Sequence, residues 1–467
     1  MDFDTAEDFY LRLISLKKGQ QIVYRYFYIF NLLVLAFLLS SGTDISASEP
    51  ETPPHVRVYT LSDLCRTACK TAEQIKIQQN DLFIAKEDRK RALSVLIPRA
   101  TAFGSYSLNR EPDEYSPDIS AFGVKLNQTF TLNGKEIIAL DMSEDAIDEQ
   151  SMLVKAVTSD YILEVARAYY QILSTQRYVE IAKSDVQRLE KHRQAVQERL
   201  DVGQVTKTAL FRAEAELSGA RTTLVKSENG FKLAKASLQR LVEIDKHFSI
   251  SNNDIKALKN FVYSYEELKQ TALEKRAEIK AAAQQVNIAE KNIQYTRGAY
   301  WPTLSLEGSY TNSSFEFDSP RYGTTVSEDA ENSSLEANLT FTMFDGGLRA
   351  AEVRQALADK KKADLALEMQ KKQIILETKS AWLDYETAIS VLLTLKDELK
   401  SARENFNSVN MQFRYGMADS VDMMDANTLL VKAERELSDA EYSHAFSILG
   451  IMRARGDIVA VLTAGGI

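Results

Sequence analysis

The sequence predicts an α+β protein built from two tandem copies of one unit, in the order helix, strand, strand, very long helix, turn and long helix. Motifs return in the same order about 204 to 213 residues later, as Gly104-Ser105-Tyr106 does in Gly308-Ser309-Tyr310, which indicates an internal duplication. Glycine (18) and proline (8) are scarce among 467 residues, which favours long elements over many short ones. Two segments of each half alternate between apolar and polar residues, as strands with one apolar face do.

The N-terminus resembles an export signal, and residues 1–48 are predicted to be a signal peptide. Basic residues, including Arg25, precede the apolar run Ile29 to Leu39, and Ser46-Ala47-Ser48 supplies small residues for cleavage before Glu49. The alternative is a permanent membrane anchor. That run is much shorter than the roughly 20 residues that a membrane-spanning helix needs, so export is favoured.

The alternating segments predict two strands in each half, and polar loops at 109–120 and 312–333 join them. This pattern fits either a half-buried sheet or a barrel wall with one lipid face and one wet face. Tyr300 and Trp301 stand where a helix enters a strand, as membrane-interface aromatics do. Four strands cannot close a barrel, so a membrane sheet requires several chains, and three chains would supply twelve strands. We expect repeats at 49–242 and 263–467, a linker at 243–262, and strands near 100–108, 121–132, 303–311 and 334–344.

Each half then predicts one exceptionally long helix. No breaker occurs from Leu348 to Phe413, a stretch that would be about 100 Å long as a helix. Apolar residues between Ala381 and Phe413 recur at alternating steps of four and three, a heptad seam that requires a supercoiled partner helix. The segment Lys135 to Val202 is interpreted in the same way.

Both long helices are expected to end in the same turn. Gly203 and Gly416 can take the left-handed conformation that closes a helix, and we expect tight turns there with no room for a side chain. Thr206 and Asp419 can cap the returning helices. These segments are either simple helical hairpins or the tip of a long hollow projection.

Composition argues against several other classes of protein. The net charge of −9 gives no support for nucleic-acid binding. Four scattered histidines and two cysteines, Cys65 and Cys69, provide no metal site or disulfide framework. Asp345-Gly346-Gly347 lacks the lysine and hydroxyl of a phosphate loop, and no catalytic triad is recognisable. We therefore expect no enzyme, no catalytic residue, no metal and no cofactor.

Several short motifs, in order and along the whole mature chain, resemble those of the TolC-type outer membrane efflux proteins. Each motif is weak alone, but the ordered set is specific. They are Tyr59-Thr60-Leu61-Ser62-Asp63-Leu64, Trp301-Pro302-Thr303-Leu304-Ser305-Leu306, Phe344-Asp345-Gly346-Gly347, Tyr415-Gly416, and Ser420-Val421-Asp422-Met423-Met424-Asp425-Ala426.

The resemblance implies a homotrimer in which a twelve-stranded β-barrel in the outer membrane continues into a periplasmic tunnel of twelve helices. It implies a passive exit duct of a tripartite efflux pump or type I secretion system. The implied partners are outer membrane lipid, a periplasmic adaptor protein and an inner membrane transporter. The alternative is a soluble periplasmic coiled-coil scaffold or adaptor, which should show one helical hairpin rather than two. Drugs, metal ions and secreted polypeptides all remain open as cargo.

The resemblance also implies the functional residues. Asp422 and Asp425 match the paired aspartates of the family's pore constriction, and their spacing places both on one helical face. The alternative is that they are acids of a first helical turn, favourable to the helix dipole. The family's polar latch is not recognisable, because Phe413 and Ala418 offer no polar partner. The segments that resemble the adaptor-docking tips are Val202, Gly203, Gln204 and Val205, and Tyr415, Gly416, Met417 and Ala418.

Overall fold

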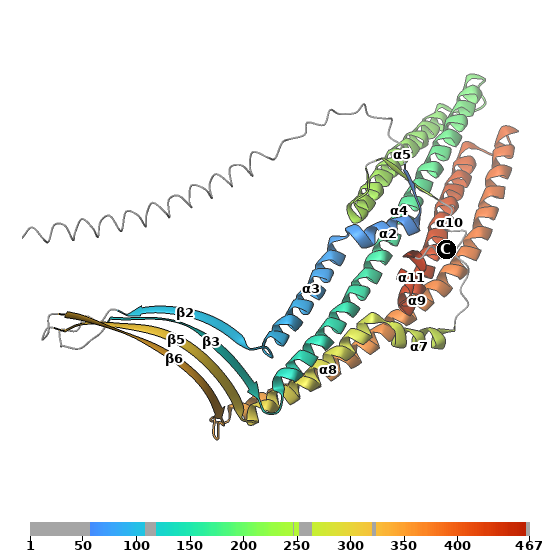
Figure 1. Ribbon diagram of the computed structural model, residues 1–467. Helices are drawn as coiled ribbons and strands as arrows, with labels where there is room; N and C mark the ends of the chain where they lie inside the picture. The colour runs from blue at the N-terminus through green and yellow to red at the C-terminus, as the bar shows by residue number, and fades with distance from the viewer. Residues whose placement is uncertain (1–56, 108–117, 246, 252–263, 320–323, 464–467) are drawn as a thin grey trace, which may run out of the picture. The chain divides into compact units, whose positions relative to one another are not determined.

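A computed structural model of the chain describes residues 57–107, 118–245, 247–251, 264–319 and 324–463 (Figure 1). All described residues belong to one compact unit. The signal peptide expected at 1–48 therefore lies outside the described residues.

The two halves of the described chain repeat the same order of elements. The long helices α4 (Lys135–Asp201) and α9 (Leu348–Arg414) have 67 residues each, and their return helices α5 (Lys207–Val242) and α10 (Ser420–Arg455) have 36 each. No described helix is both long and apolar enough to cross a lipid bilayer. The other elements are β1 (Arg57–Tyr59), α2 (Leu61–Thr71), α3 (Glu73–Ser94), β2 (Arg99–Ser107), β3 (Asp118–Thr131), β4 (Phe248–Ile250), α7 (Tyr265–Lys275), α8 (Ala277–Arg297), η1 (Gly298–Tyr300), β5 (Thr303–Ser319), β6 (Thr324–Thr340) and α11 (Ile458–Thr463).

The helices lie side by side in a layer whose order follows from their contacts. Helices α3 and α5 pack on α4, and α9 packs on α8 and α10. Both α8 and α10 also contact α4, so these two shorter helices fill the space between α4 and α9, as Figure 1 shows. The heptad seam predicted in α9 is confirmed, because its side chains from Ala381 to Phe413 are all buried or half-buried.

The four long strands form one antiparallel sheet in the order β2-β3-β5-β6, which is curved in Figure 1. Phe122, Val124 and Leu126 of β3 and Leu335 and Leu339 of β6 are large apolar side chains that remain exposed. The outer strands β2 and β6 each pair on one side only. The sheet therefore presents apolar side chains and two unpaired edges in the single chain.

The second hairpin of the sheet is longer than the sequence predicts. Strands β5 and β6 have 17 residues each, so most of the expected loop 312–333 is strand. Thr311 pairs with Asn332 and Ser314 with Asp329, so pairing continues where apolar alternation ends. The expected strand 334–344 also ends earlier, at Thr340. The prediction was wrong because it depended on apolar alternation, which a hairpin polar on both faces does not show.

The helix expected before each pair of strands is in fact two helices. Ala72 separates α2 from α3, and Arg276 separates α7 from α8, each with an extended backbone (ψ 123° and 127°). The expected linker 243–262 also contains β4, which pairs in parallel with β1. Residues 246 and 252–262 of that linker lie outside the described residues.

The largest hydrophobic core lies where the two halves meet. It joins α2, the middle of α4, the ends of α5 and α10, β4 and α11. Tyr169 is fully buried there, and its hydroxyl donates to the carbonyl of Ser251 at 2.5 Å. Toward the turns, the apolar clusters that join the helices are small, such as the one with Val196, Leu210 and Phe413. The hairpins therefore project from a well-packed centre as thin coiled coils.

Candidate functional site

The two hairpin turns have matching backbone geometry. Gly203 has φ +74° and Gly416 has φ +76°, which confirms the predicted left-handed conformation. A Cβ atom added at either glycine would meet no heavy atom within 4 Å, so the expectation that a side chain has no room was wrong. The constraint at these turns is the backbone angle alone. Thr206 and Asp419 cap α5 and α10, as predicted.

The residues expected at the tips lie at the ends of the two hairpins, and most are exposed. Val202, Tyr415 and Met417 are 69%, 71% and 72% exposed. A cleft of about 1060 Å³ lies between the tips and is lined by Gln204 and Val205 from one and by Tyr415, Gly416, Met417 and Ala418 from the other. The structure therefore brings the two predicted tips to one cleft.

Asp422 and Asp425 are both exposed on the first turns of α10. The carboxylate of Asp422 accepts the backbone N–H of Asp419 at 3.1 Å, and Asp419 accepts the N–H of Asp422 at 2.9 Å, which completes a capping box. Asp422 is thus a helix-capping residue in the single chain. This role does not conflict with a place in a pore, because a carboxylate has several acceptor sites.

A row of polar side chains on α4 faces the second hairpin. Tyr178, Asp185, His192 and Arg199 are spaced by seven residues, so they follow one face of the helix. We call this row, with Arg188, the polar seam. None of these residues was predicted as functional from the sequence. The heptad spacing of polar residues within an otherwise apolar coiled coil was the available signal.

The polar seam binds α10 through paired side chains. Asp185 accepts from the amide of Asn427 at 2.7 Å, and Arg188 donates to the same amide at 2.9 Å and to Glu434 at 3.4 Å. The hydroxyl of Tyr178 contacts the carboxylate of Asp439. These contacts join the two hairpins of one chain along several turns of helix.

The seam continues to the tips through two further side chains. The Nε2 atom of His192 lies 2.9 Å from Oγ of Ser420. Arg199 donates to the backbone carbonyls of Phe413 and Arg414, and its guanidinium lies 4.2 Å from the centre of the Phe413 ring. The side chain of Phe413 offers no polar partner, so its backbone carbonyl is the acceptor at this position.

His192 is the buried titratable group of this seam. Its side chain is 5% exposed, and its ring lies 4.9 Å from the ring of Phe413. Burial, with a smaller effect of the positive charge on Arg199, lowers the pKa of His192 to about 4. The imidazole is therefore neutral at physiological pH.

A cluster of charges marks the place where α8 and α10 meet between α4 and α9. Arg276 donates to Glu278 at 2.9 Å and to Glu377 at 3.0 Å, and Arg453 contacts Asp160 and Glu278. Burial opposes ionisation of Glu278, but the hydrogen bond from Arg276 and the charges of Arg453 and Arg276 outweigh it and lower the pKa of Glu278 to about 2. The cluster thus joins four helices by ion pairs.

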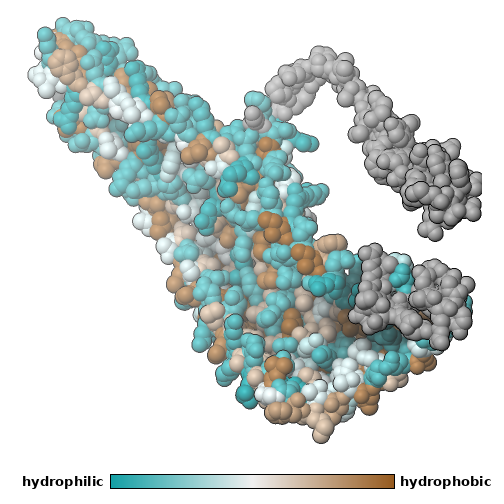
Figure 2. Space-filling model, turned by 90° about the vertical axis from the view of Figure 1, so that its left-hand side faces the viewer, coloured by the Kyte–Doolittle hydropathy of each residue, from teal (hydrophilic) through white to brown (hydrophobic). Residues whose placement is uncertain are grey.

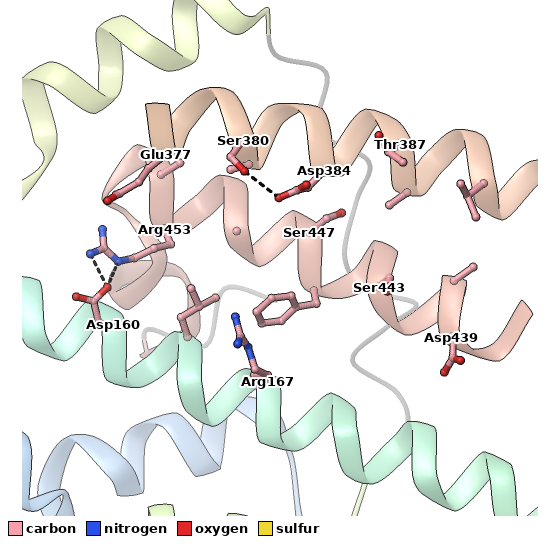
Figure 3. Close-up of a pocket in the computed structure, with 18 of the residues that line it drawn as sticks. Asp160, Arg167, Glu377, Ser380, Asp384, Thr387, Asp439, Ser443, Ser447 and Arg453 are labelled. Carbon is pink, nitrogen blue, oxygen red and sulfur yellow. Dashed lines mark hydrogen bonds and ion pairs between the residues drawn. The ribbon is translucent and has the colours of Figure 1, made fainter. Parts of the chain in front are cut away.

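Beside this cluster, a groove of about 1270 Å³ runs along α10 between α4 and α9 (Figure 3). Small residues of α10, including Ala440, Ser447 and Gly450, contribute to its lining. Figure 3 shows Arg453 turned toward Asp160, while the guanidinium of Arg167 from α4 lies 5.1 Å from the centre of the Phe446 ring. The groove is open and is lined by both acidic and basic side chains. Among the described residues, no group of side chains is found that could bind a metal ion.

Tyr300 and Trp301 lie between α8 and β5 and are 45% and 57% exposed. The guanidinium of Arg349 lies 4.9 Å from the Tyr300 ring and is held by Asp345 at 2.7 Å. The backbone N–H of Gly347 also donates to Asp345. The Asp-Gly-Gly turn therefore fixes the boundary between the sheet and α9, where the aromatic pair lies.

Solved structures show that this is the fold of outer membrane channels. The Campylobacter jejuni CmeC outer membrane channel superposes with a TM-score of 0.73 at 18% identity, over 88% of this chain and 90% of CmeC. CusC superposes with a TM-score of 0.75 at 15% identity, over 88% of this chain and 95% of CusC.

Sequence comparisons agree with the fold. The chain is 23% identical to the outer membrane protein TolC of Vibrio cholerae over 78% of this chain and 83% of TolC. It is 23% identical to the outer membrane efflux protein BepC of Brucella suis over 92% and 91% of the two chains. The profile of the outer membrane efflux protein family matches residues 71–242 and 268–456. The chain therefore belongs to the outer membrane efflux protein family, which is a family of channels rather than enzymes.

Proposed function

We propose that three copies of this chain form the outer membrane channel of a tripartite efflux pump or type I secretion system. In this role the channel is a passive exit duct, served by an inner membrane transporter and a periplasmic adaptor. Its relatives include efflux proteins and the alkaline protease secretion protein AprF of Pseudomonas aeruginosa, so both kinds of system are represented among them. A soluble periplasmic scaffold is not favoured, because the chain has a curved sheet and two hairpins.

The open sheet carries this proposal. Its edges β2 and β6 leave backbone groups unpaired, and each such group costs several kcal/mol in hydrocarbon. Its apolar side chains, such as Val124 and Leu339, are exposed in the single chain. Closing three sheets edge to edge would pair every edge and direct these side chains to lipid, with Tyr300 and Trp301 near the membrane interface.

The edges of the helical layer support the same assembly. On α9, Leu365, Met369, Leu376 and Leu383 are exposed at heptad-compatible spacing. On α3 at the opposite edge, Ile77 and Ile84 are exposed seven residues apart. Hydrophobic patches of this kind interrupt the mostly hydrophilic surface in Figure 2. In a trimer, the α9 edge of one copy would contact the α3 edge of the next. Such contacts form a closed ring when a threefold rotation relates successive copies.

Within this trimer, the site residues take the roles that we propose for them. Asp422 and Asp425 would form a ring of six carboxylates at the inner end of the tunnel. The tips at 202–205 and 415–418 would receive the adaptor, since they are exposed and line one cleft.

Mass and conductance measurements test the proposal. The mature protein, purified in detergent, should scatter light as a trimer and should produce ion-conducting events in planar lipid bilayers. A monomer that remains soluble without detergent and does not conduct would contradict the channel and support the periplasmic scaffold.

A further inference from the structure

His192 is a buried titratable side chain shared between the two hairpins of one chain. It lies on α4 of the first hairpin, yet its ring contacts Ser420 on α10 and Phe413 on α9 of the second. Near the tips, the imidazole of His192 therefore contacts both helices of the opposite hairpin.

We propose that His192 makes closure of the tunnel's inner end sensitive to acid, with the two hairpins held together by the neutral imidazole and separated when it takes up a proton. This inference rests on the proposed channel function and concerns how the same tips are regulated.

The surroundings of His192 favour the neutral ring. The hydroxyl of Ser420 and the ring of Phe413 are uncharged, and Arg199 carries a positive charge nearby. The nearby carboxylates already have partners, as Glu214 and Glu434 do with arginines of α4 and as Asp419 and Asp422 do with backbone N–H groups. The ionisable groups on the packed elements include Asp185, Arg188, Arg193, Glu198 and Arg199 of α4, Lys207, Arg212 and Glu214 of α5, Arg414 of α9, Asp422, Asp425 and Glu434 of α10, and the cap Asp419.

A proton on His192 therefore favours separation. The pKa is about 4 in the closed arrangement, whereas an exposed histidine has a pKa near 6.5. Closure gains stability above pH 6.5, and this gain is lost as the pH falls toward 4. Between pH 7 and pH 5 the opening equilibrium should rise roughly 20-fold for each chain.

Single-channel recording in planar lipid bilayers tests this switch with the full mature protein. The open probability at pH 5 should exceed that at pH 7 by roughly 20-fold or more, because each of three chains contributes. His192→Gln keeps a hydrogen-bonding side chain but cannot titrate, so its open probability should not change over this range. His444→Gln is the matched control, since His444 is also partly buried but stacks on Tyr385 beyond the tips. It should respond like the parent.

Further variants separate the switch from other effects of acid. His192→Phe is a second variant that cannot titrate at this position. Acid opening that persists in both His192 variants would overturn the proposal. The double variant Asp422→Asn, Asp425→Asn should still open in acid, and loss of opening there would assign the effect to the aspartates instead. A conducting protein whose opening does not depend on pH contradicts the switch alone. A protein that never conducts contradicts the channel itself.

Discussion

At the scale of single residues, two side chains with large shifts in pKa have opposite preferences for charge. His192 lies among a hydroxyl, an aromatic ring and an arginine, which favour its neutral form. Glu278 lies between two guanidinium groups, which favour its ionised form. The first contact can be released by a proton under mild acid, whereas the second resists acid down to about pH 2. The structure thus combines a labile contact near the tips with a durable one near the centre.

Replacing Glu278 should destabilise the centre of the helical layer. Glu278→Gln would leave two buried guanidiniums short of a counter-charge, which typically costs about 3 kcal/mol or more. The pKa of Glu278 is lowered from 4.5 to about 2, so its stabilisation is present above pH 4.5 and is lost as the pH falls toward 2. Thermal unfolding followed by circular dichroism should show a lower midpoint at pH 7 for the variant and a smaller gap from the parent near pH 2.

The matched control is Glu368→Gln on the exposed side of α9. Glu368 pairs with Lys371 at 2.8 Å, but both side chains are solvated, so this substitution should leave the midpoint nearly unchanged. Equal effects of the two substitutions would contradict a special role for the buried cluster.

The glycine turns constrain the chain through backbone angle. Gly416→Val should cost on the order of 1 kcal/mol or more, because a β-branched residue rarely adopts positive φ. Gly416→Asn should be tolerated, since asparagine adopts this conformation and the space beside Gly416 is open. Cross-linking to a periplasmic adaptor should fall for valine but not for asparagine, at equal abundance in the outer membrane. Loss in both would mean that the added side chain itself blocks docking.

At the scale of elements, the sequence predicted the long helices well because their signal is long and redundant. Helices α4 and α9 each end within one residue of the expected position. The breaks at Ala72 and Arg276 were not predicted, since neither glycine nor proline marks them. Arg276 is extended where its guanidinium joins Glu278 and Glu377, so a tertiary contact outweighs its local helix propensity.

The extended hairpin β5–β6 shows another limit of pattern analysis. A strand of 17 residues spans about 55 Å, although a membrane strand needs only about 10 residues. The apolar alternation covers only the part from Leu304 to Tyr310, which is the part that lipid would contact. The rest is polar, and its pairing depends on the register of its partner strand. We therefore infer that the hairpin continues beyond the membrane.

The exposed apolar stripe on α9 should be required for assembly. Leu376→Glu would place a charge in the middle of the stripe and should reduce the fraction of trimer seen by light scattering. Val391→Glu is the control, because Val391 is also exposed (42%) but is displaced by one heptad position from Leu376, on the side of the same helix that lines the groove along α10. If both variants remain trimers, the stripe is not the contact between copies.

At the scale of the whole molecule, function depends on features that a single chain shows only in part. The polar seam and the charge cluster are complete within one chain, because α4, α8, α9 and α10 supply both partners. These contacts were missed from the sequence, since heptad spacing identifies a buried face without identifying its partner. The aspartate pair is the reverse case. It was predicted from the resemblance, and only an assembly of several copies would give it a function beyond the capping of α10 by Asp422.

The ring proposed for Asp422 and Asp425 can be tested by ion selectivity. Six carboxylates around a narrow opening would attract cations and bind multivalent ions, as charged rings do in other channels. The double change to asparagine keeps the shape and removes the charge, so cation preference and block by trivalent cations should both fall. Crowded carboxylates also raise one another's pKa, so the parent's preference should weaken as the pH falls.

The capping of α10 provides the control for this prediction, because Asp419 and Asp422 form its capping box. Asn is as good a cap as Asp, so Asp419→Asn should preserve the start of α10 while removing one charge at the tip. If the ring sets selectivity, this variant should keep most of the parent's cation preference, because Asp419 precedes the helical face that carries Asp422 and Asp425. Equal losses in the two variants would instead indicate a general effect of tip charge. A double variant that keeps the parent's selectivity would leave the two aspartates as first-turn acids, and the constriction would have to lie elsewhere.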